Sequence, residues 1–188
     1  MARIEPIAME QAQGKARELL NELVERGGEP GPMVCAMANA PALLRGYLDL
    51  TRAMKRSHID RRITERINLA VHERLGCDYC LVAHTRAARA LEVPEEEIQL
   101  ARQGTSRDPA IAAIVAFARQ VLTASAEIDD ADLERLHAHG YGHEQIAEVA
   151  GLASLQLLTG SFNLIADIHA PAEALRELEP RPTGTGAA

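Results

Sequence analysis

Apolar residues recur at intervals of three and four along most of this sequence, which is the spacing of one face of an α-helix. The segment 12–26 has this pattern, and similar segments follow Pro41, Asp60, Pro94 and Asp108. No segment shows sustained alternation of apolar and polar residues, and β-branched residues are sparse. Ala, Leu, Glu, Arg and Gln, all good helix formers, dominate the composition. The sequence therefore predicts an all-α fold.

Residues that begin and end helices stand at the edges of these segments. Pro41 suits the first turn of a helix that continues through Met54. Asp60 suits the N-cap of the next helix, which Gly76 would end. Gly and Pro cluster over residues 26–33, where we expect no helix to continue. Further helices are predicted from near Cys77 to about 91, after Pro94, after Asp108, over 129–140 and over 142–169.

The length of 188 residues suits one domain, which we place at residues 1–178 with its core at about 30–170. The last ten residues, EPRPTGTGAA, have the composition of a disordered tail over 179–188.

Charge and hydropathy exclude several kinds of partner. The net charge is -7 and no dense run of Lys and Arg occurs, which argues against nucleic acid and anionic membranes. The N-terminus lacks the basic start and apolar run of a secretory signal. The longest uncharged run, Val149 to Ala166, contains several polar residues and is too polar for a span of about 20 apolar residues. We expect a buried helix there, and a cytoplasmic protein.

Two of the three cysteines form the motif Cys77-x-x-Cys80, and His84 follows. On a helix, residues three apart have Cβ atoms about 5–6 Å from each other. The first turn can tighten towards the ~3.5–4.5 Å that a disulfide requires. His84 lies four residues after Cys80 and seven after Cys77, so it shares their face. The spacing predicts a pair that cycles between dithiol and disulfide.

The surroundings of this motif favour a reactive thiolate. A helix N-terminus offers unpaired N–H groups and a positive dipole end. His84 can accept the thiol proton or stand nearby as imidazolium, and Glu65 can orient it if the two helices pack as a hairpin. The residues leave open which cysteine attacks, because the dipole favours Cys77 and nearness to His84 favours Cys80.

Zinc binding is an alternative use of the same residues. Cys77, Cys80, His84 and Glu65 would supply the four ligands of a zinc site. No second Cys-x-x-Cys motif exists and Cys35 is remote in sequence. We therefore favour redox chemistry and expect no metal or cofactor.

The pattern Glu65-x(11)-Cys77-x-x-Cys80-x-x-x-His84, within ERINLAV…GCDYCLVAHT, resembles the core of the alkylhydroperoxidase D / carboxymuconolactone decarboxylase superfamily. The similarity extends to the upstream APALLRGYLDL and the downstream uncharged helix, over roughly residues 30–170. The resemblance implies an alkylhydroperoxidase D-like helical fold, with the cysteine pair at the N-terminus of a central helix. It also implies assembly into homo-trimers or homo-hexamers.

The same resemblance implies a peroxidase that reduces alkyl hydroperoxides or hydrogen peroxide. In that scheme Cys80 attacks the peroxide and becomes a sulfenic acid, and Cys77 condenses with it to a disulfide. Glu65 and His84 form a proton relay, and a dihydrolipoyl or thioredoxin-like protein reduces the disulfide. The best-studied branch has a histidine between the cysteines, where this chain has Tyr79. This departure puts the efficiency of the peroxidase in question.

Two other functions compete with the peroxidase. One is the decarboxylase chemistry that names the other half of the superfamily, which does not rely on a cysteine pair. The other is a non-catalytic helical assembly protein with a zinc-filled site.

The remaining candidates are expected to be structural. His72, seven residues after Glu65, faces the same way and would extend the relay, but we favour a structural or surface role. Asn163 must find hydrogen-bond partners if buried, and Cys35 is expected to be a small buried hydrophobe. Tyr79 is either a wall of a pocket or a packing residue. His137, His139 and His143 are expected to form a polar junction between helices rather than a metal site.

Overall fold

The computed structural model describes residues 2–180, and within them the regular structure is helical, with no strand. The all-α prediction is confirmed. The α-helices are α1 (Gly14–Glu25), α2 (Pro32–Met37), α3 (Pro41–Met54), α4 (Arg61–Leu75), α5 (Asp78–Ala90), α6 (Glu95–Gln103), α7 (Pro109–Thr123), α8 (Asp130–Ala138), α9 (His143–Ala166) and α10 (Ala172–Leu175). Most of the predicted tail lies outside the described residues, and the domain boundary at 178 stays a prediction.

The predicted helix boundaries agree with the local chemistry. The carboxylate of Asp60 accepts a hydrogen bond from the Arg62 backbone N–H at 2.8 Å, so it caps α4. Gly76 ends that helix with φ of +74°, a left-handed conformation that glycine adopts at little cost. The expected break over residues 26–33 is wrong at its end, because Pro32 begins α2. Proline is tolerated there since the first helical N–H groups have no intrahelical partner.

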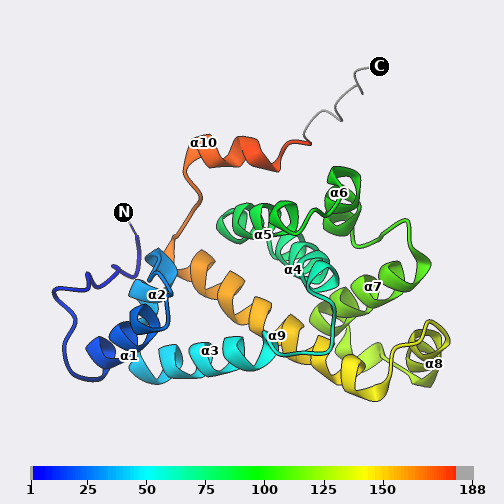
Figure 1. The fold of residues 1–188 in the computed structure, drawn as a ribbon, viewed down its shortest axis with the longest axis horizontal. Coiled ribbons are helices and arrows are strands. Elements are labelled where there is room, and N and C mark those ends of the chain that lie inside the picture. The colour runs from blue at the N-terminus through cyan, green and yellow to red at the C-terminus, as the bar shows by residue number, and fades with distance from the viewer. Residues whose placement is uncertain (1, 181–188) are drawn as a thin grey trace.

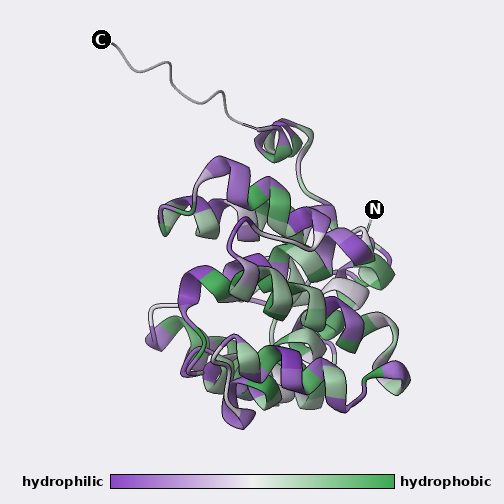
Figure 2. Ribbon diagram, turned by 90° about the vertical axis from the view of Figure 1, so that its right-hand side faces the viewer, coloured by the Kyte–Doolittle hydropathy of each residue, from purple (hydrophilic) through white to green (hydrophobic). Residues whose placement is uncertain are grey.

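Helices α4 and α9 form the centre of the fold. Helix α9 runs through the middle of the molecule, between α3 on one side and α4 and α5 on the other (Figure 1). Helix α4 packs against α5, α6, α7 and α9. Purple and green residues alternate along the helices in Figure 2, as expected of amphipathic helices with one buried face. These two helices bring together residues far apart in the sequence.

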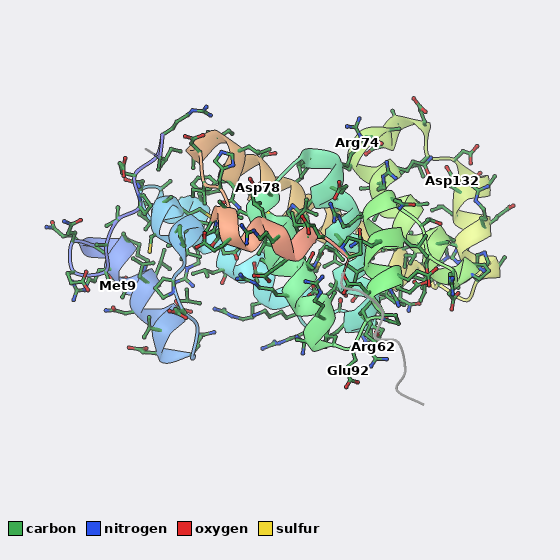
Figure 3. The ribbon with its side chains drawn as sticks, turned by 90° about the horizontal axis from the view of Figure 1, so that it is seen from above. Met9, Arg62, Arg74, Asp78, Glu92 and Asp132 are labelled. Carbon is green, nitrogen blue, oxygen red and sulfur yellow. A yellow bond between two sulfur atoms is a disulfide. The ribbon has the colours of Figure 1, made fainter. Side chains whose placement is uncertain are left out.

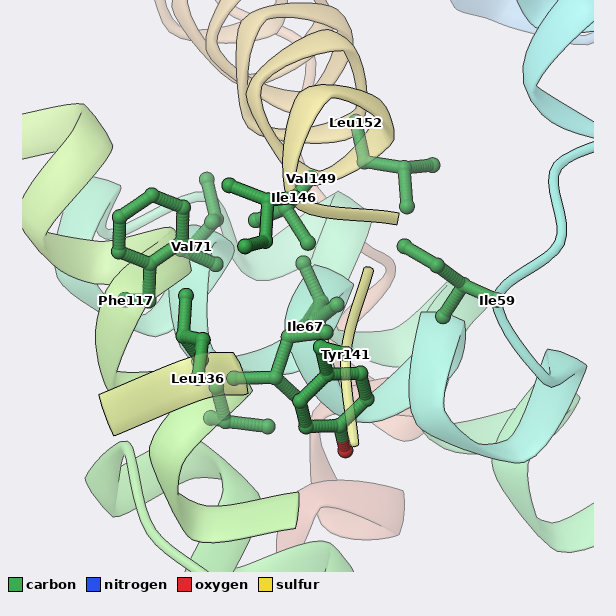
Figure 4. Close-up of a cluster of buried hydrophobic side chains, with 13 residues drawn as sticks. Ile59, Ile67, Val71, Phe117, Leu136, Tyr141, Ile146, Val149 and Leu152 are labelled. Carbon is green, nitrogen blue, oxygen red and sulfur yellow. The ribbon is translucent and has the colours of Figure 1, made fainter. Parts of the chain in front are cut away.

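The largest apolar cluster joins α4, α7, α8 and the first half of α9. Figure 4 shows Ile67 and Val71 of α4 facing Ile146 and Val149 of α9, with Phe117 beside them. A second cluster holds α1, α2 and α3 together, with Leu19, Leu20, Met37 and Leu44 at its centre.

Helix α9 is long and apolar enough, by length and composition alone, to cross a membrane, contrary to the expectation from its polar residues. Half of its most apolar stretch is buried inside this protein, as in the core helix of a folded domain. The prediction of a buried helix therefore holds for half of that stretch. Beyond its first turn, where His143 and Glu144 are exposed, the exposed residues of α9 form one uncharged stripe: Ala147, Ala150, Ser154, Leu157 and Ile165.

The C-terminal segment lies across α5 (Figures 1 and 3). The backbone N–H of Ala170 donates to the Asp78 carboxylate at 3.2 Å, at the start of α5. Further along, Arg86 makes two hydrogen bonds to Glu177, at 2.6 and 2.8 Å. Arg102 of α6 donates to the carbonyl oxygen of Leu178 at 2.7 Å. The segment therefore fixes α5 from the side opposite the core.

Candidate functional site

Cys77 and Cys80 meet at the start of α5 and are joined by a disulfide. The left-handed turn at Gly76 ends α4, and Cys77 follows directly as the N-cap of α5. Its sulfur accepts a hydrogen bond from the Cys80 backbone N–H at 3.4 Å. The two Cα atoms are 5.4 Å apart, and the side chains are 1% and 5% exposed. The pair is thus close enough to cycle between dithiol and disulfide within one helical turn.

Glu65 and His84 form a second pair beside the cysteines. Helices α4 and α5 pack together, and Glu65 Oε2 lies 2.7 Å from His84 Nδ1. The Asn68 amide lies 3.4 Å from the same carboxylate oxygen. The structure therefore brings together the four residues singled out in the sequence, with the carboxylate holding the imidazole in a fixed orientation.

His72 is fully buried at the site, which excludes a surface role. Its ring stacks on that of His84 with centroids 5.1 Å apart and planes inclined by 14°. Its Nε2 lies 2.8 Å from Gln156 Oε1, and its buried Nδ1 has no hydrogen-bond partner among residues 2–180. Burial, together with the nearby His84, lowers the pKa of His72 to about 3 against an opposing effect of Gln156, so the ring is neutral.

Asn163 of α9 reaches the sulfur atoms. Its Nδ2 lies 3.2 Å from Cys80 Sγ and 3.8 Å from Cys77 Sγ, and the side chain is 1% exposed. Its Oδ1 is buried without a hydrogen-bond partner in the part of the chain that the structure describes. The residue does find polar partners, as expected, but those partners are the cysteines, which makes it part of the site.

A cavity of about 250 Å³ opens beside Cys80. Its lining is mostly apolar and aromatic, and includes Met33, Tyr47, Tyr79, Leu155 and His84. A second cavity of about 170 Å³ is lined by Glu65, Asn68 and again His84. His84 thus lines both the cavity that reaches Cys80 and the cavity that reaches Glu65.

Tyr79 and Cys35 lie at the edge of this arrangement. Tyr79 lines the cavity, so it is a wall of the pocket, and burial raises the pKa of its phenol. Cys35 in α2 is half-buried, with its Sγ 3.4 Å from the Pro30 carbonyl oxygen. Burial raises the pKa of the Cys35 thiol. Cys35 is therefore the unpaired cysteine of the chain, less buried than expected.

The cluster His137, His139 and His143 lies between α8 and α9, away from the cysteines. His137 Nδ1 lies 2.7 Å from the Tyr141 carbonyl oxygen, and its ring meets that of His143 edge to face at 4.6 Å. These contacts support the expected junction between helices.

Sequence reasoning missed Gln156 and Tyr47 and undervalued His72 and Asn163. His72 carried a usable signal, because it lies seven residues after Glu65 and four after Asn68 on α4. Gln156 and Asn163, seven apart within the uncharged run, share a face of α9 in the same way. Tyr47 gave no such signal, since only the packing of α3 against α9 brings it to the cavity.

An all-α fold with a buried Cys-x-x-Cys pair at a helix start, next to a Glu–His pair, defines a thiol–disulfide type of site. Residues 41–124 match the model of the Carboxymuconolactone decarboxylase family. No curated protein matches the sequence.

Solved structures share the fold over nearly the whole chain. An uncharacterized peroxidase-related protein with an alkylhydroperoxidase AhpD core, from Ralstonia eutropha JMP134, is 22% identical with a TM-score of 0.78; the match covers 96% of this chain and 98% of that one. The debrominase Bmp8 is 21% identical with a TM-score of 0.75, over 94% of this chain and 98% of its own. The family match over residues 41–124 and the shared fold support the resemblance to the alkylhydroperoxidase D / carboxymuconolactone decarboxylase superfamily that the sequence indicates.

Proposed function

We propose that the protein is a thiol-dependent peroxidase that reduces alkyl hydroperoxides with Cys77 and Cys80. The observation that carries the proposal is the buried disulfide at the start of α5, beside a cavity and a Glu65–His84 pair. A superfamily that includes alkylhydroperoxidase D supports the same conclusion. The apolar and aromatic cavity wall favours an alkyl hydroperoxide over hydrogen peroxide, which has no apolar group to bury.

The reaction balances with two electrons from the dithiol. The Cys80 thiolate attacks the terminal oxygen of the hydroperoxide, so that an S–O bond forms, the O–O bond breaks and the alkoxide leaves as an alcohol after protonation. The Cys77 thiolate then attacks the Cys80 sulfenic acid, the S–S bond forms and the hydroxyl leaves as water. Cys80 is assigned to the first step because it, rather than Cys77, lines the cavity.

Proton transfer falls to Glu65 and His84 in this scheme. His84 lines the same cavity as Cys80 and is held by Glu65, so it can take the thiol proton and return one to the leaving alkoxide. Tyr79, in place of the histidine of the best-studied branch, contributes an un-ionised phenol to the wall. A dihydrolipoyl or thioredoxin-like protein then reduces the disulfide, in a reducing compartment such as the cytoplasm.

Steady-state peroxide consumption tests the proposal. Purified protein is supplied with tert-butyl or cumene hydroperoxide and either a dihydrolipoyl or a thioredoxin-type reductant. We expect catalytic consumption that requires both cysteines. Because Bmp8 has the same fold and its variant was solved with 2,3,4-tribromopyrrole, that compound is the matched alternative electron acceptor. If the protein turns over the bromopyrrole but consumes none of the hydroperoxides, the peroxidase proposal is refuted. The cysteine pair would then still be a redox-active dithiol.

We also propose that the protein forms a homo-trimer or homo-hexamer. The uncharged exposed stripe of α9, defined above, includes Leu157 at 42% and Ile165 at 62% exposed, which is an unfavourable surface to leave in water. Light scattering behind a sizing column decides the matter. A mass near that of one 20.4 kDa chain at micromolar concentration would contradict the proposal.

A further inference from the structure

The polar atoms around the disulfide leave one ring nitrogen unused. His72, Cys77 and Cys80 are all buried, and each offers a ligand atom within 4.8 Å of the others. Gln156 Oε1 can only accept a hydrogen bond, so His72 Nε2 must carry the ring proton. His72 Nδ1 therefore keeps its lone pair, and it has no hydrogen-bond partner within the described part of the chain.

We propose that the reduced protein binds one zinc ion through Cys77 Sγ, Cys80 Sγ and His72 Nδ1. The spacing Cys-x-x-Cys is common in zinc sites, and thiolate and imidazole donors select zinc over Mg²⁺ and Ca²⁺. Tetrahedral bonds of about 2.3 Å to sulfur and 2.0–2.1 Å to nitrogen require donors roughly 3.5–4 Å apart. The observed cluster needs only a small adjustment to reach that separation once the sulfurs are no longer linked.

The histidine that binds the metal differs from the one that the sequence suggests. His84 Nδ1 is already engaged by the Glu65 carboxylate at 2.7 Å, and His84 is not part of the three-residue cluster. His72 has the support usual for a metal ligand, because Gln156 holds its other ring nitrogen and fixes its tautomer. The zinc site is thus distinct from the Glu65–His84 relay, although it shares the cysteines.

The fourth position of the tetrahedron remains open. Cys80, His72 and Gln156 all line the 250 Å³ cavity, so the position can take water or a small thiol from that side. Asn163 Oδ1 is buried without a hydrogen-bond partner among the described residues. It competes for the fourth ligand position if the Asn163 amide group rotates by about half a turn. Three protein ligands and an open position make a site that can be loaded and emptied.

Metal loading balances as two steps. A dithiol reductant first converts the disulfide to two thiols and is itself oxidised to a disulfide. Zinc then replaces two thiol protons, which pass to solvent. The bound metal removes both thiolates from reaction with peroxide. The inference rests on the same reduced dithiol as the proposed function, but metal binding is measured without turnover, so each can fail alone.

A zinc titration of the reduced protein, in competition with a chromophoric chelator, tests the inference. We expect one zinc per wild-type chain, none in Cys80→Ser, and strongly weakened binding in His72→Leu. His84→Ala removes the ring stacked on His72 but none of the proposed ligands, so this variant should still bind one zinc per chain. Gln156→Leu should weaken binding ~10–100-fold, as expected for the loss of a residue that orients a ligand.

X-ray absorption at the zinc edge provides a readout that does not depend on the folding of His72→Leu. The wild-type complex and the His84→Ala complex should both show two sulfur ligands and one imidazole. Loss of the imidazole in His84→Ala would overturn the assignment to His72. Failure of the wild-type protein to bind stoichiometric zinc would overturn the site itself.

Discussion

The two halves of α9 are both buried, but they bury different chemistry. The first half places Ile146, Val149 and Leu152 in the apolar cluster with α4 and α7 (Figure 4). The second half places Gln156 and Asn163 against His72 and the sulfurs. Helix α4 is divided in the same way, with Ile67 and Val71 on one face and Glu65, Asn68 and His72 on another.

The comparison separates residues that stabilise the fold from residues that cost stability. Apolar burial contributes roughly 25 cal/mol per Å². A buried polar atom without a partner costs about 1–3 kcal/mol. Among the described residues, His72 Nδ1 and Asn68 Oδ1 on the polar face of α4 are such atoms, and so is Asn163 Oδ1 in the polar half of α9. We expect these atoms to be retained because they interact with a ligand or with reacting groups in another state of the site.

The largest effect is expected at the reacting sulfur. Cys80→Ser should reduce hydroperoxide consumption on the order of 10³-fold or more, because oxygen is a far weaker nucleophile at neutral pH. Cys77→Ser should leave a sulfenic acid on Cys80 that a dimedone probe traps. Cys35→Ser is the matched control and should keep full activity. A dimedone adduct on Cys77 in the Cys80→Ser protein would reverse the two roles.

The second-largest effect is expected at the proton relay formed by Glu65 and His84. Glu65→Gln keeps the size of the side chain and removes the charge that holds His84, so we expect the rate with alkyl hydroperoxide to fall about 10²–10³-fold. Stopped-flow measurement of thiol oxidation gives the rate of the chemical step. A Glu65→Gln protein as fast as the wild type would remove the relay from the scheme.

A pair of substitutions in α9 tests the contrast between its halves. Leu152→Ala in the apolar half should lower the free energy of unfolding by about 2–5 kcal/mol, the usual range for truncating a buried leucine. Asn163→Leu in the polar half should change it by less than about 1 kcal/mol, because an apolar side chain of similar volume needs no partner. Denaturant titration gives both values.

The same pair should behave in the opposite way in catalysis. Asn163→Leu removes the amide beside both sulfurs and should slow thiol oxidation roughly tenfold, the equivalent of one hydrogen bond. Folded Leu152→Ala should react at the wild-type rate. If Asn163→Leu were strongly destabilised but fully reactive, the polar half would be structural.

A further prediction concerns the pH dependence of stability. The pKa of His72 is about 3 in the folded protein and 6.5 when unperturbed. Between pH 6.5 and pH 3, His72 is therefore protonated in the unfolded chain and neutral in the folded protein. The stability is complete above pH 6.5 and falls with decreasing pH by about 1.4 kcal/mol per unit towards pH 3. Between pH 6.5 and 5 the loss from this group is roughly 2 kcal/mol.

His72→Leu isolates this contribution, because the carboxylates titrate in both proteins. Guanidinium unfolding at pH 7, 6 and 5 should show a shallower decline for His72→Leu than for the wild type. Parallel declines would mean that the folded ring accepts a proton.

Local sequence signals predicted most of the fold. Asp60 as an N-cap, Gly76 as a left-handed C-cap and Pro41 at a helix start each act within one turn, so they could be read directly. Helix α2 was missed because proline and glycine mark both the end of one helix and the start of the next.

The site could be predicted only where its residues share one motif. Glu65, Cys77, Cys80 and His84 fall within one hairpin of helices, and their spacing carried the prediction. Asn163 lies 83 residues after Cys80, and only the packing of α9 against α5 brings its amide to the sulfur. The spacing of His72 from Glu65 places it on the same face of α4, but only the structure shows that this histidine is buried beside the disulfide.

The most direct test of the central claim is a thiol count on the reduced protein after one equivalent of cumene hydroperoxide. The chain has three cysteines, so three thiols are present at the start. We predict that two disappear, that alkylation and peptide mass spectrometry find Cys77 linked to Cys80, and that Cys35 remains free. Retention of all three thiols, or a disulfide that includes Cys35, would contradict the account.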